Sequence, residues 1–207
     1  MLQVLLELLE ALKEEEEPAK VLIFSYSTAL LDILEPFAQS LAYNYLRLDG
    51  KTRTESRQDL VERFNSDPDV FLFLISTKAG GVGLNITGAN VVIVFDPSWN
   101  PSNDLQAQDR AYRIGQRRDV RVYRLITAGS IEENVYLRQV YKQQMSKNAV
   151  DGEKATRYFN AVLRHRKGEL FGINNMFAVR EGKSCLTDGI LKRKEAVEQV
   201  TNIMEFD

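Results

Sequence analysis

Two arginines near the middle of the chain have the type and spacing needed to act on a phosphate group. Arg110 and Arg113 lie three positions apart in the segment QAQDRAYRIGQ, residues 106–116. In a helix, this spacing puts both side chains on one face. A guanidinium group is a fixed fork of donors that suits the charge developing on a transferred phosphoryl group. A solvated basic helix is the alternative, but it gives no reason for the glutamines and the glycine that frame the arginines, Gln106 among them.

A glycine-rich segment, STKAGGVGLN at residues 76–85, offers a second place for phosphate contact. It follows an apolar run that predicts a buried strand, so we expect it at the carboxyl edge where open parallel sheets bind ligands. Three glycines in four positions let the backbone approach a phosphate closely and point N–H groups at it. Thr77 and Lys78 add a hydroxyl and a cation. An ordinary glycine-rich turn is an equally good explanation of this segment taken alone.

Other matches to functional motifs have simpler explanations. The segment DGKT at residues 49–52 ends like a phosphate-binding P-loop, but Tyr45 stands where that motif needs a glycine five positions before Gly50. A turn between a strand and a helix explains it better. His165 lies in a basic run that is typical of a solvated face. Because Cys185 is the only cysteine, the chain has no internal disulfide and no cysteine-based zinc site, and we expect no metal-binding residues.

Apolar runs alternate with amphipathic segments over most of the chain, which predicts a parallel sheet with helices on both faces, an α/β layer from about residue 19 to 149. The predicted strands are 21–25, 45–48, 70–76, 91–95 and 121–126. The predicted helices are 28–41, 52–64, 102–114 and 130–145. Pro36 should kink or split the first of these helices. Thr52 and Ser130 open segments with capping-box spacing.

Charge is distributed unevenly, although the net charge is only −2. Residues 7–17 hold six glutamates and one lysine, and we interpret residues 1–18 as an N-terminal helix and an acidic linker. Residues 110–124 hold six arginines and one aspartate. This basic stripe is compatible with a polyanionic binding partner. No apolar run has the length of a membrane span, so a membrane partner is not expected. Residues 150–207 read as a mainly helical, basic extension.

The order and spacing of five segments closely resemble motifs IV to VI of the Swi/Snf-type DNA-dependent ATPases in helicase superfamily two. These segments are FSY, RLDGKT, ISTKAGGVGLNI, DPSWNP and QAQDRAYRIGQ. The resemblance covers about residues 20–147 and implies a RecA-like second lobe of the motor. RNA helicases of the DEAD-box kind typically end the last motif in Arg-Gly-Arg instead. The tail GELFGINNMF is similar to the excision-repair group related to the Cockayne syndrome B protein, of the excision-repair cross-complementing 6-like type.

The resemblance implies a role for eight residues. Arg110 and Arg113 match the paired arginines that reach the γ-phosphate of ATP held by the other lobe, and Gln106 matches the glutamine that helps organise that site. Gly83 and Asn85 match positions facing the nucleotide, although many helicases have aspartate in place of Asn85. The positions near the phosphates of the tracked DNA strand are Ser25, Thr77 and Lys78.

The same resemblance implies which lobe of the motor binds ATP and which lobe supplies the arginines. The chain has neither a P-loop nor an Asp-Glu-x-His box, so ATP with Mg²⁺ would be held mainly by an N-terminal RecA-like lobe outside this sequence. We therefore expect negligible ATP hydrolysis by the chain alone. The implied partners are double-stranded DNA, that first lobe and DNA-repair proteins, in the nucleus. Residues 150–207 would be a brace or regulatory extension. Two alternatives stay open: an RNA-directed helicase lobe and a non-catalytic protein-interaction module.

Overall fold

The computed structural model describes residues 1–80 and 83–151 of the chain. It forms two units, one from Met1 to Ile126 and one that begins at Thr127. The second unit contributes one described helix, α6 (Ile131–Asp151). Nearly all of the predicted extension, with His165 and Cys185, lies outside the described residues.

The first unit is built on a parallel sheet of five strands in the order β2-β3-β1-β4-β5. The strands are β1 (Val21–Ser25), β2 (Tyr45–Leu48), β3 (Leu72–Ser76), β4 (Val91–Val94) and β5 (Arg121–Arg124). The three central strands, β1, β3 and β4, are buried along their whole length, as expected for apolar strands covered on both faces. All five predicted strands are confirmed, with ends that differ by at most two residues.

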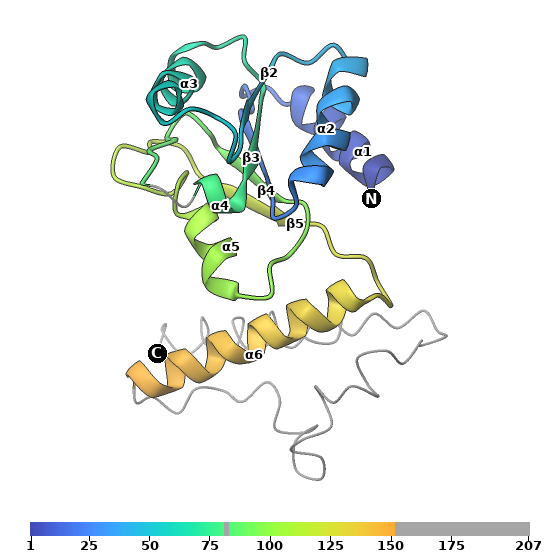
Figure 1. Ribbon diagram of the computed structural model, residues 1–207, viewed down its shortest axis with the longest axis vertical. Helices are drawn as coiled ribbons and strands as arrows, with labels where there is room; N and C mark the ends of the chain where they lie inside the picture. Colours follow the sequence, from blue (N-terminus) through green and yellow to red (C-terminus); the bar gives the residue numbers. More distant parts are fainter. Residues whose placement is uncertain (81–82, 152–207) are drawn as a thin grey trace, which may run out of the picture. The chain divides into compact units, whose positions relative to one another are not determined.

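Helices cover both faces of this sheet (Figure 1). α1 (Leu2–Lys13) and α2 (Thr28–Ser40) pack on one face, and α3 (Thr54–Ser66), α4 (Thr77–Gly80) and α5 (Pro101–Gln108) pack on the other. Successive strand residues point to opposite faces. In β1, Val21 and Ile23 therefore join the leucines of α1 and α2, whereas Leu22 and Phe24 join the cluster that contains Phe64 of α3 and Ala107 of α5. The predicted α/β fold, a parallel sheet with helices on both faces, is confirmed.

α2 is not split at Pro36, since the helix continues through the proline with buried residues on both sides of it, Leu31 and Ala38 among them. The expected cap of α3 was wrong. Thr52 does not cap α3, whose N-cap is Arg53. Its hydroxyl instead accepts a hydrogen bond from the Asp49 backbone N–H at 3.1 Å, which closes the turn after β2.

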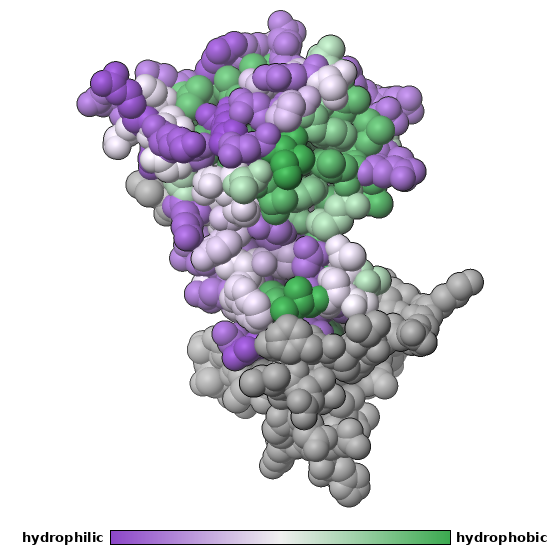
Figure 2. Space-filling view, turned by 45° about the vertical axis from the view of Figure 1, so that its right-hand side comes forward, coloured by the Kyte–Doolittle hydropathy of each residue, from purple (hydrophilic) through white to green (hydrophobic). Residues whose placement is uncertain are grey.

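The surface of the first unit mixes apolar and charged side chains. Figure 2 shows apolar residues gathered on one part of it and bordered by hydrophilic residues. Leu2 and Val4 of α1 and Ile33 of α2 are among the exposed large apolar side chains. Within the described ranges, no helix is both long and apolar enough to cross a membrane.

Candidate functional site

The carboxyl ends of the central strands bring together the three residues predicted to lie near DNA phosphates. Ser25 ends β1, and Thr77 and Lys78 open α4 directly after β3. β1 and β3 pair in register up to Ser25 and Ser76, so their following loops are neighbours. Ser25 and Thr77 are buried, whereas Lys78 is exposed. Of the three, Lys78 alone presents its polar group freely to an external phosphate.

Lys78 is also joined to the loop after β1. Its ammonium group lies over the ring of Tyr26, 4.7 Å from the ring centroid. Tyr26 is 40% exposed, so this cation–π contact lies at the surface, where such contacts stabilise by about 0.5–1 kcal/mol. The contact orders a lysine that would otherwise sample many rotamers. The sequence analysis did not single out Tyr26, although an aromatic residue beside the predicted phosphate contacts was a usable signal.

The glycine-rich segment continues into a loop that is fixed at residues 83–88. Gly83 has φ of +52°, a left-handed conformation that glycine adopts without strain. Asn85 is exposed, and its carbonyl accepts a hydrogen bond from the Asn65 side-chain amide at 3.0 Å. Asn65 also accepts from the Gly88 N–H at 2.8 Å. A Cβ at Gly88 would lie 2.8 Å from the Asn65 backbone, so only glycine allows this approach. The role of Asn65 depends on folding and had no signal in the sequence.

The two candidate catalytic arginines lie on a turn and not on a helix. α5 ends at Gln108, so the prediction of a helix over 102–114 was wrong, and so was the inference of a shared helical face. The chain tightens after Gln108, where the Arg110 N–H bonds to the Ala107 carbonyl three residues back, at 3.3 Å. The Arg110 carbonyl then accepts a hydrogen bond from the Ile86 N–H at 3.1 Å. This tertiary bond takes the place of the bond that the carbonyl would accept from residue 114 in a continued helix.

This turn places a candidate arginine beside the glycine-rich loop. Nη1 of Arg113 donates to the Gly83 carbonyl at 3.3 Å, and the Arg110 backbone bonds to Ile86 as described. Arg113 is exposed, and Arg110 is partly buried. Gln106 lies exposed on α5, a few residues before the turn. The structure thus joins the two segments that the sequence analysis treated as separate candidates for phosphate contact.

Gln116 holds the turn in place. Its side-chain nitrogen lies within hydrogen-bonding distance of the carbonyls of Thr87, Ala89 and Ala111, at 3.1, 2.6 and 3.2 Å. Its side-chain oxygen accepts from the backbone N–H groups of residues 117 and 118, both at 3.0 Å. The preceding Gly115 has φ of +106°, which turns the chain toward this amide. One side chain therefore ties the arginine turn to the glycine-rich loop.

Asp96 organises the loop after β1 and was also missed by the sequence analysis. Its carboxylate oxygens accept the Tyr26 backbone N–H at 3.0 and 3.2 Å. Burial raises the pKa of Asp96, while hydrogen bonds from Ser25, Tyr26 and Ser27 act in the opposite direction. An aspartate directly after a predicted strand was a usable signal, because the carboxyl ends of neighbouring parallel strands meet at one edge.

Besides Arg113, three further arginines of the predicted basic stripe make hydrogen bonds within the protein. Arg118 donates to the carbonyls of Pro18 and Gly88, and Arg121 forms a bidentate pair with Glu15 at 2.6 and 2.5 Å. With the Gln108 amide oriented to match, Arg124 donates to it at 2.6 and 3.2 Å. Glu15 thus offsets the charge of Arg121, whereas Arg118 and Arg124 keep their charge and direct it toward neutral oxygens of the protein.

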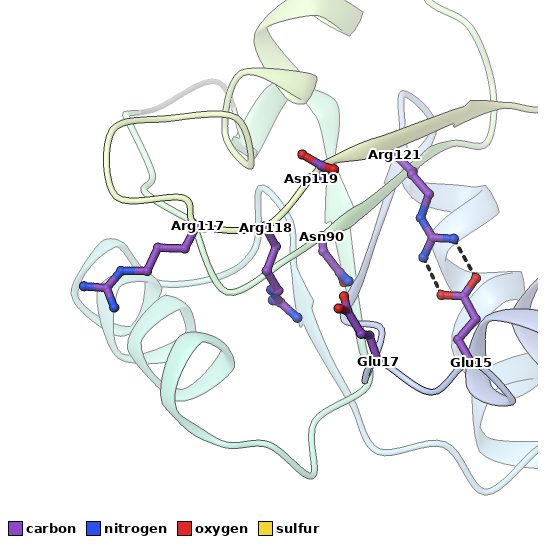
Figure 3. Close-up of a pocket in the computed structure, with 7 residues that line it drawn as sticks. All are labelled: Glu15, Glu17, Asn90, Arg117, Arg118, Asp119 and Arg121. Carbon is purple, nitrogen blue, oxygen red and sulfur yellow. Dashed lines mark hydrogen bonds and ion pairs between the residues drawn. The ribbon is translucent and has the colours of Figure 1, made fainter.

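Arg121 and Arg118 line a hollow of about 520 Å³ together with Glu15, Glu17, Asn90, Arg117 and Asp119 (Figure 3). Asn90 precedes β4, and Arg121 begins β5, so this hollow lies at the amino edge of the sheet. None of the eight predicted site residues lines it. Its three acidic and three basic side chains balance, so it is not a strongly charged anion site.

The carboxyl-edge site offers donors and cations rather than metal ligands. Arg110, Arg113 and Lys78 are cationic, and the loop at Gly83 adds backbone groups. In the part of the chain that the structure describes, no three histidine, cysteine or carboxylate side chains gather where they could hold a metal ion. These groups can bind and stabilise the negative charge of a phosphate.

Comparison with known proteins identifies the family of the chain. Residues 1–115 match the model of the helicase conserved C-terminal domain. The chain is 54% identical over 199 residues to DNA excision repair protein ERCC-6-like 2 of Mus musculus, covering 95% of the chain and 13% of that protein. It is 50% identical over 142 residues to DNA excision repair protein ERCC-6 of Homo sapiens, covering 69% of the chain and 10% of that protein. The chain therefore spans a small part of these longer relatives.

A solved structure supports the fold. The crystal structure of the C-terminal part of the Fun30 ATPase domain aligns with a TM-score of 0.63 and 47% sequence identity, covering 65% of this chain and 43% of that one. The parallel five-stranded sheet with helices on both faces is therefore RecA-like, as the resemblance implied. The chain belongs to the helicase conserved C-terminal domain family, as the C-terminal lobe of a Swi/Snf-type ATPase of the excision-repair group.

Proposed function

We propose that this chain is the second motor lobe of an ATP-dependent translocase that moves on double-stranded DNA in DNA repair or chromatin remodelling. The observation that carries the proposal is the contact between Arg113 and the Gly83 carbonyl at 3.3 Å. It joins the arginine turn to the glycine-rich loop and leaves the arginine exposed, facing outward from its own unit. An exposed arginine on a braced turn is suited to act on a nucleotide held by another domain.

In this proposal, Arg113 and Arg110 act as arginine fingers on ATP bound by a first lobe. A cation placed against the γ-phosphate stabilises the charge that develops during transfer and raises the hydrolysis rate by about 10³–10⁵-fold. Gln106 helps to organise that site, and Gly83 and Asn85 face the nucleotide. The Mg²⁺ that accompanies ATP would be held mainly by the first lobe and would stabilise the negative charge of the phosphates there, while this chain supplies the arginines.

Lys78, with Ser25 and Thr77, contacts the phosphates of the tracked DNA strand. Because phosphate contacts carry no base information, DNA binding should have little sequence preference and should weaken steeply with salt. Both lobes would hold the same strand, so each cycle of closure and reopening advances the motor along DNA. This function implies a nuclear protein that works with other DNA-repair proteins.

ATP hydrolysis by the full-length protein tests the proposal. We expect double-stranded DNA to stimulate hydrolysis more than RNA does, and Arg113→Ala to reduce the stimulated rate by at least about 10³-fold with the fold intact. Arg117→Ala is the matched control, since Arg117 is also exposed and follows four residues later but lines the amino-edge hollow. Near-normal turnover of Arg113→Ala would rule out the arginine-finger role. Equal stimulation by RNA would favour an RNA-directed helicase lobe.

A further inference from the structure

Asp96, in the loop after β4, holds the neighbouring loop of residues 25–27 at the carboxyl edge of the sheet. It follows β4, which pairs in parallel with β1, and so its side chain reaches the loop after β1. The carboxylate accepts the Tyr26 N–H through both oxygens, at 3.0 and 3.2 Å. The Ser25 hydroxyl and the Ser27 N–H also donate to it. One half-buried side chain thus receives hydrogen bonds from all three residues of the 25–27 loop.

These hydrogen bonds determine the loop's conformation. Inside the loop, the Ser25 oxygen accepts the Ser27 N–H at 3.2 Å and lies 2.9 Å from the Ser27 carbonyl, which shares the single Ser25 hydroxyl proton with Asp96. Backbone N–H groups must be paired when they are withdrawn from water. Hydrogen bonds to an ionised acceptor are roughly twice as strong as neutral ones, so the carboxylate is the dominant anchor. Without it, the loop would keep the serine contacts alone.

The loop in turn orders Lys78. Tyr26 is anchored through its backbone and projects a ring that is 40% exposed, and the Lys78 ammonium lies 4.7 Å from the centre of that ring. Fixing a lysine side chain costs up to about 2 kcal/mol in rotamer entropy. Because the Tyr26 ring already restrains the ammonium group, the entropy cost of binding a phosphate is smaller. The contacts run from Asp96 through Tyr26 to Lys78.

We propose that Asp96 is a positioning residue for DNA, which places the 25–27 loop so that the Tyr26 ring holds Lys78 ready for a strand phosphate. Asp96 itself does not contact the DNA. The inference rests on the proposed function, because it assumes that Lys78 binds a DNA phosphate. It adds two residues, Asp96 and Tyr26, to those that determine how tightly the motor engages DNA.

DNA-stimulated ATP hydrolysis by the full-length protein separates this role from a structural one. Asp96→Asn keeps the shape but puts an amide N–H₂ group, a donor, among the backbone N–H donors of the loop. We expect the DNA concentration for half-maximal stimulation to rise about tenfold, and the rate at saturating DNA to change less than about twofold, since the charge-assisted bonds to the 25–27 loop are weakened while the arginine turn is untouched. An unchanged half-saturating concentration would overturn the proposal.

A double-mutant cycle tests whether Asp96 acts through Tyr26. In a Tyr26→Ala background, Asp96→Asn should have almost no further effect on the half-saturating DNA concentration, because coupled residues are not additive. Fully additive effects would overturn the route through Tyr26. If Asp96→Asn does not fold, Tyr26→Ala alone carries the test, since it removes an exposed ring and must raise the half-saturating concentration.

Two further variants distinguish failure of the inference from failure of the proposed function. Asp119→Asn is the same chemical change at an exposed aspartate of the amino-edge hollow and should leave stimulation unchanged. Lys78→Ala should raise the half-saturating DNA concentration at least as much as Asp96→Asn. If Lys78→Ala has no effect, the assignment of the DNA-binding edge is wrong. If Lys78→Ala has its effect and Asp96→Asn has none, only the inference about Asp96 is wrong.

Discussion

At the scale of single residues, the site depends on side chains that hold loops as much as on those that would meet a ligand. Arg113 is exposed and makes one hydrogen bond to the loop at Gly83. Its position is set by Gln116, which satisfies carbonyl groups from both loops and backbone N–H groups from its own. Replacing the amide would therefore disturb the proposed arginine finger without removing it.

Gln116→Ala tests this support. It leaves several backbone groups without their partner, each costing about 1–3 kcal/mol if it remains buried, so we expect the free energy of unfolding to fall by roughly 2–3 kcal/mol. We also expect DNA-stimulated hydrolysis by the full-length protein to fall by at least about tenfold, because a misplacement of about 1 Å can cost up to 100-fold in rate. Urea unfolding and the ATPase assay measure the two effects.

Gln58→Ala is the control for this prediction. Gln58 is exposed on α3 and bonds only to a neighbour on the same helix, Glu62 at 3.1 Å, among the contacts described. Its loss should change stability by less than about 0.5 kcal/mol. A stability loss for Gln116→Ala as small as that of the control would show that water replaces the amide and that the turn does not need it.

At the scale of elements, β2 pairs with β3 on one side, and its arginine joins it to α2 and to the turn that follows it. Arg47 pairs with Asp32 and Glu35 of α2 at 2.5 and 2.7 Å and with Asp49 at 2.8 Å. These three carboxylates raise the pKa of Arg47 even though burial acts against its charged form. The arginine thereby joins α2, the strand and the turn after it. β2 lies at the edge of the sheet, so this cluster replaces contacts that a second neighbouring strand would supply.

Arg47→Ala should lower the free energy of unfolding by about 2 kcal/mol, since hydrogen bonds to charged groups contribute about 1.5–3 kcal/mol and the remaining acids repel one another. Chemical denaturation measures the change. Arg63→Ala is the matched control, because Arg63 is 63% exposed and its pair with Asp67 is long, at 3.8 Å. Exposed pairs contribute about 0–1 kcal/mol. Equal losses for the two variants would show that the Arg47 cluster does not stabilise the strand.

The elements also show where sequence reasoning succeeded. Apolar runs such as 21–25 and 91–95 predicted the strands and the sheet, because burial on both faces depends on composition that is visible locally. The end of α5 depended on a hydrogen bond between Arg110 and Ile86, which are 24 positions apart, and local spacing continued the helix too far. The eight predicted site residues came from motif order, whereas Asn65, Asp96 and Tyr26 emerged only once the strands were paired.

At the scale of the whole unit, the acidic segment of residues 14–17 is attached to the far end of the chain's first unit. Glu15 pairs bidentately with Arg121 at the start of β5, 106 positions away, at 2.6 and 2.5 Å. Arg118 holds the Pro18 carbonyl at 3.1 Å. These contacts join the linker after α1 to the amino edge of the sheet (Figure 3).

The Glu15 pair should make stability depend on pH in a defined direction. The hydrogen bond from Arg121 lowers the pKa of Glu15 below its ordinary 4.5. A carboxyl group whose pKa is lower in the folded state stabilises the fold above its unfolded pKa, and this stabilisation is lost as pH falls through the folded pKa. We therefore expect Glu15→Gln to lower the urea midpoint at pH 7, and we expect the difference from the unmodified chain to shrink progressively below about pH 4.5.

The same difference should shrink at high salt, because the pair is partly exposed to solvent and is screened by ions. Glu16→Gln, at the next position of the acidic segment, is the matched control and should lower the midpoint at pH 7 less than Glu15→Gln does. Urea titrations at pH 7 and pH 3, each at low and high salt, give all the required midpoints. A Glu15→Gln difference that is the same at both pH values would show that the linker is held by the Pro18 carbonyl contact and not by the ion pair.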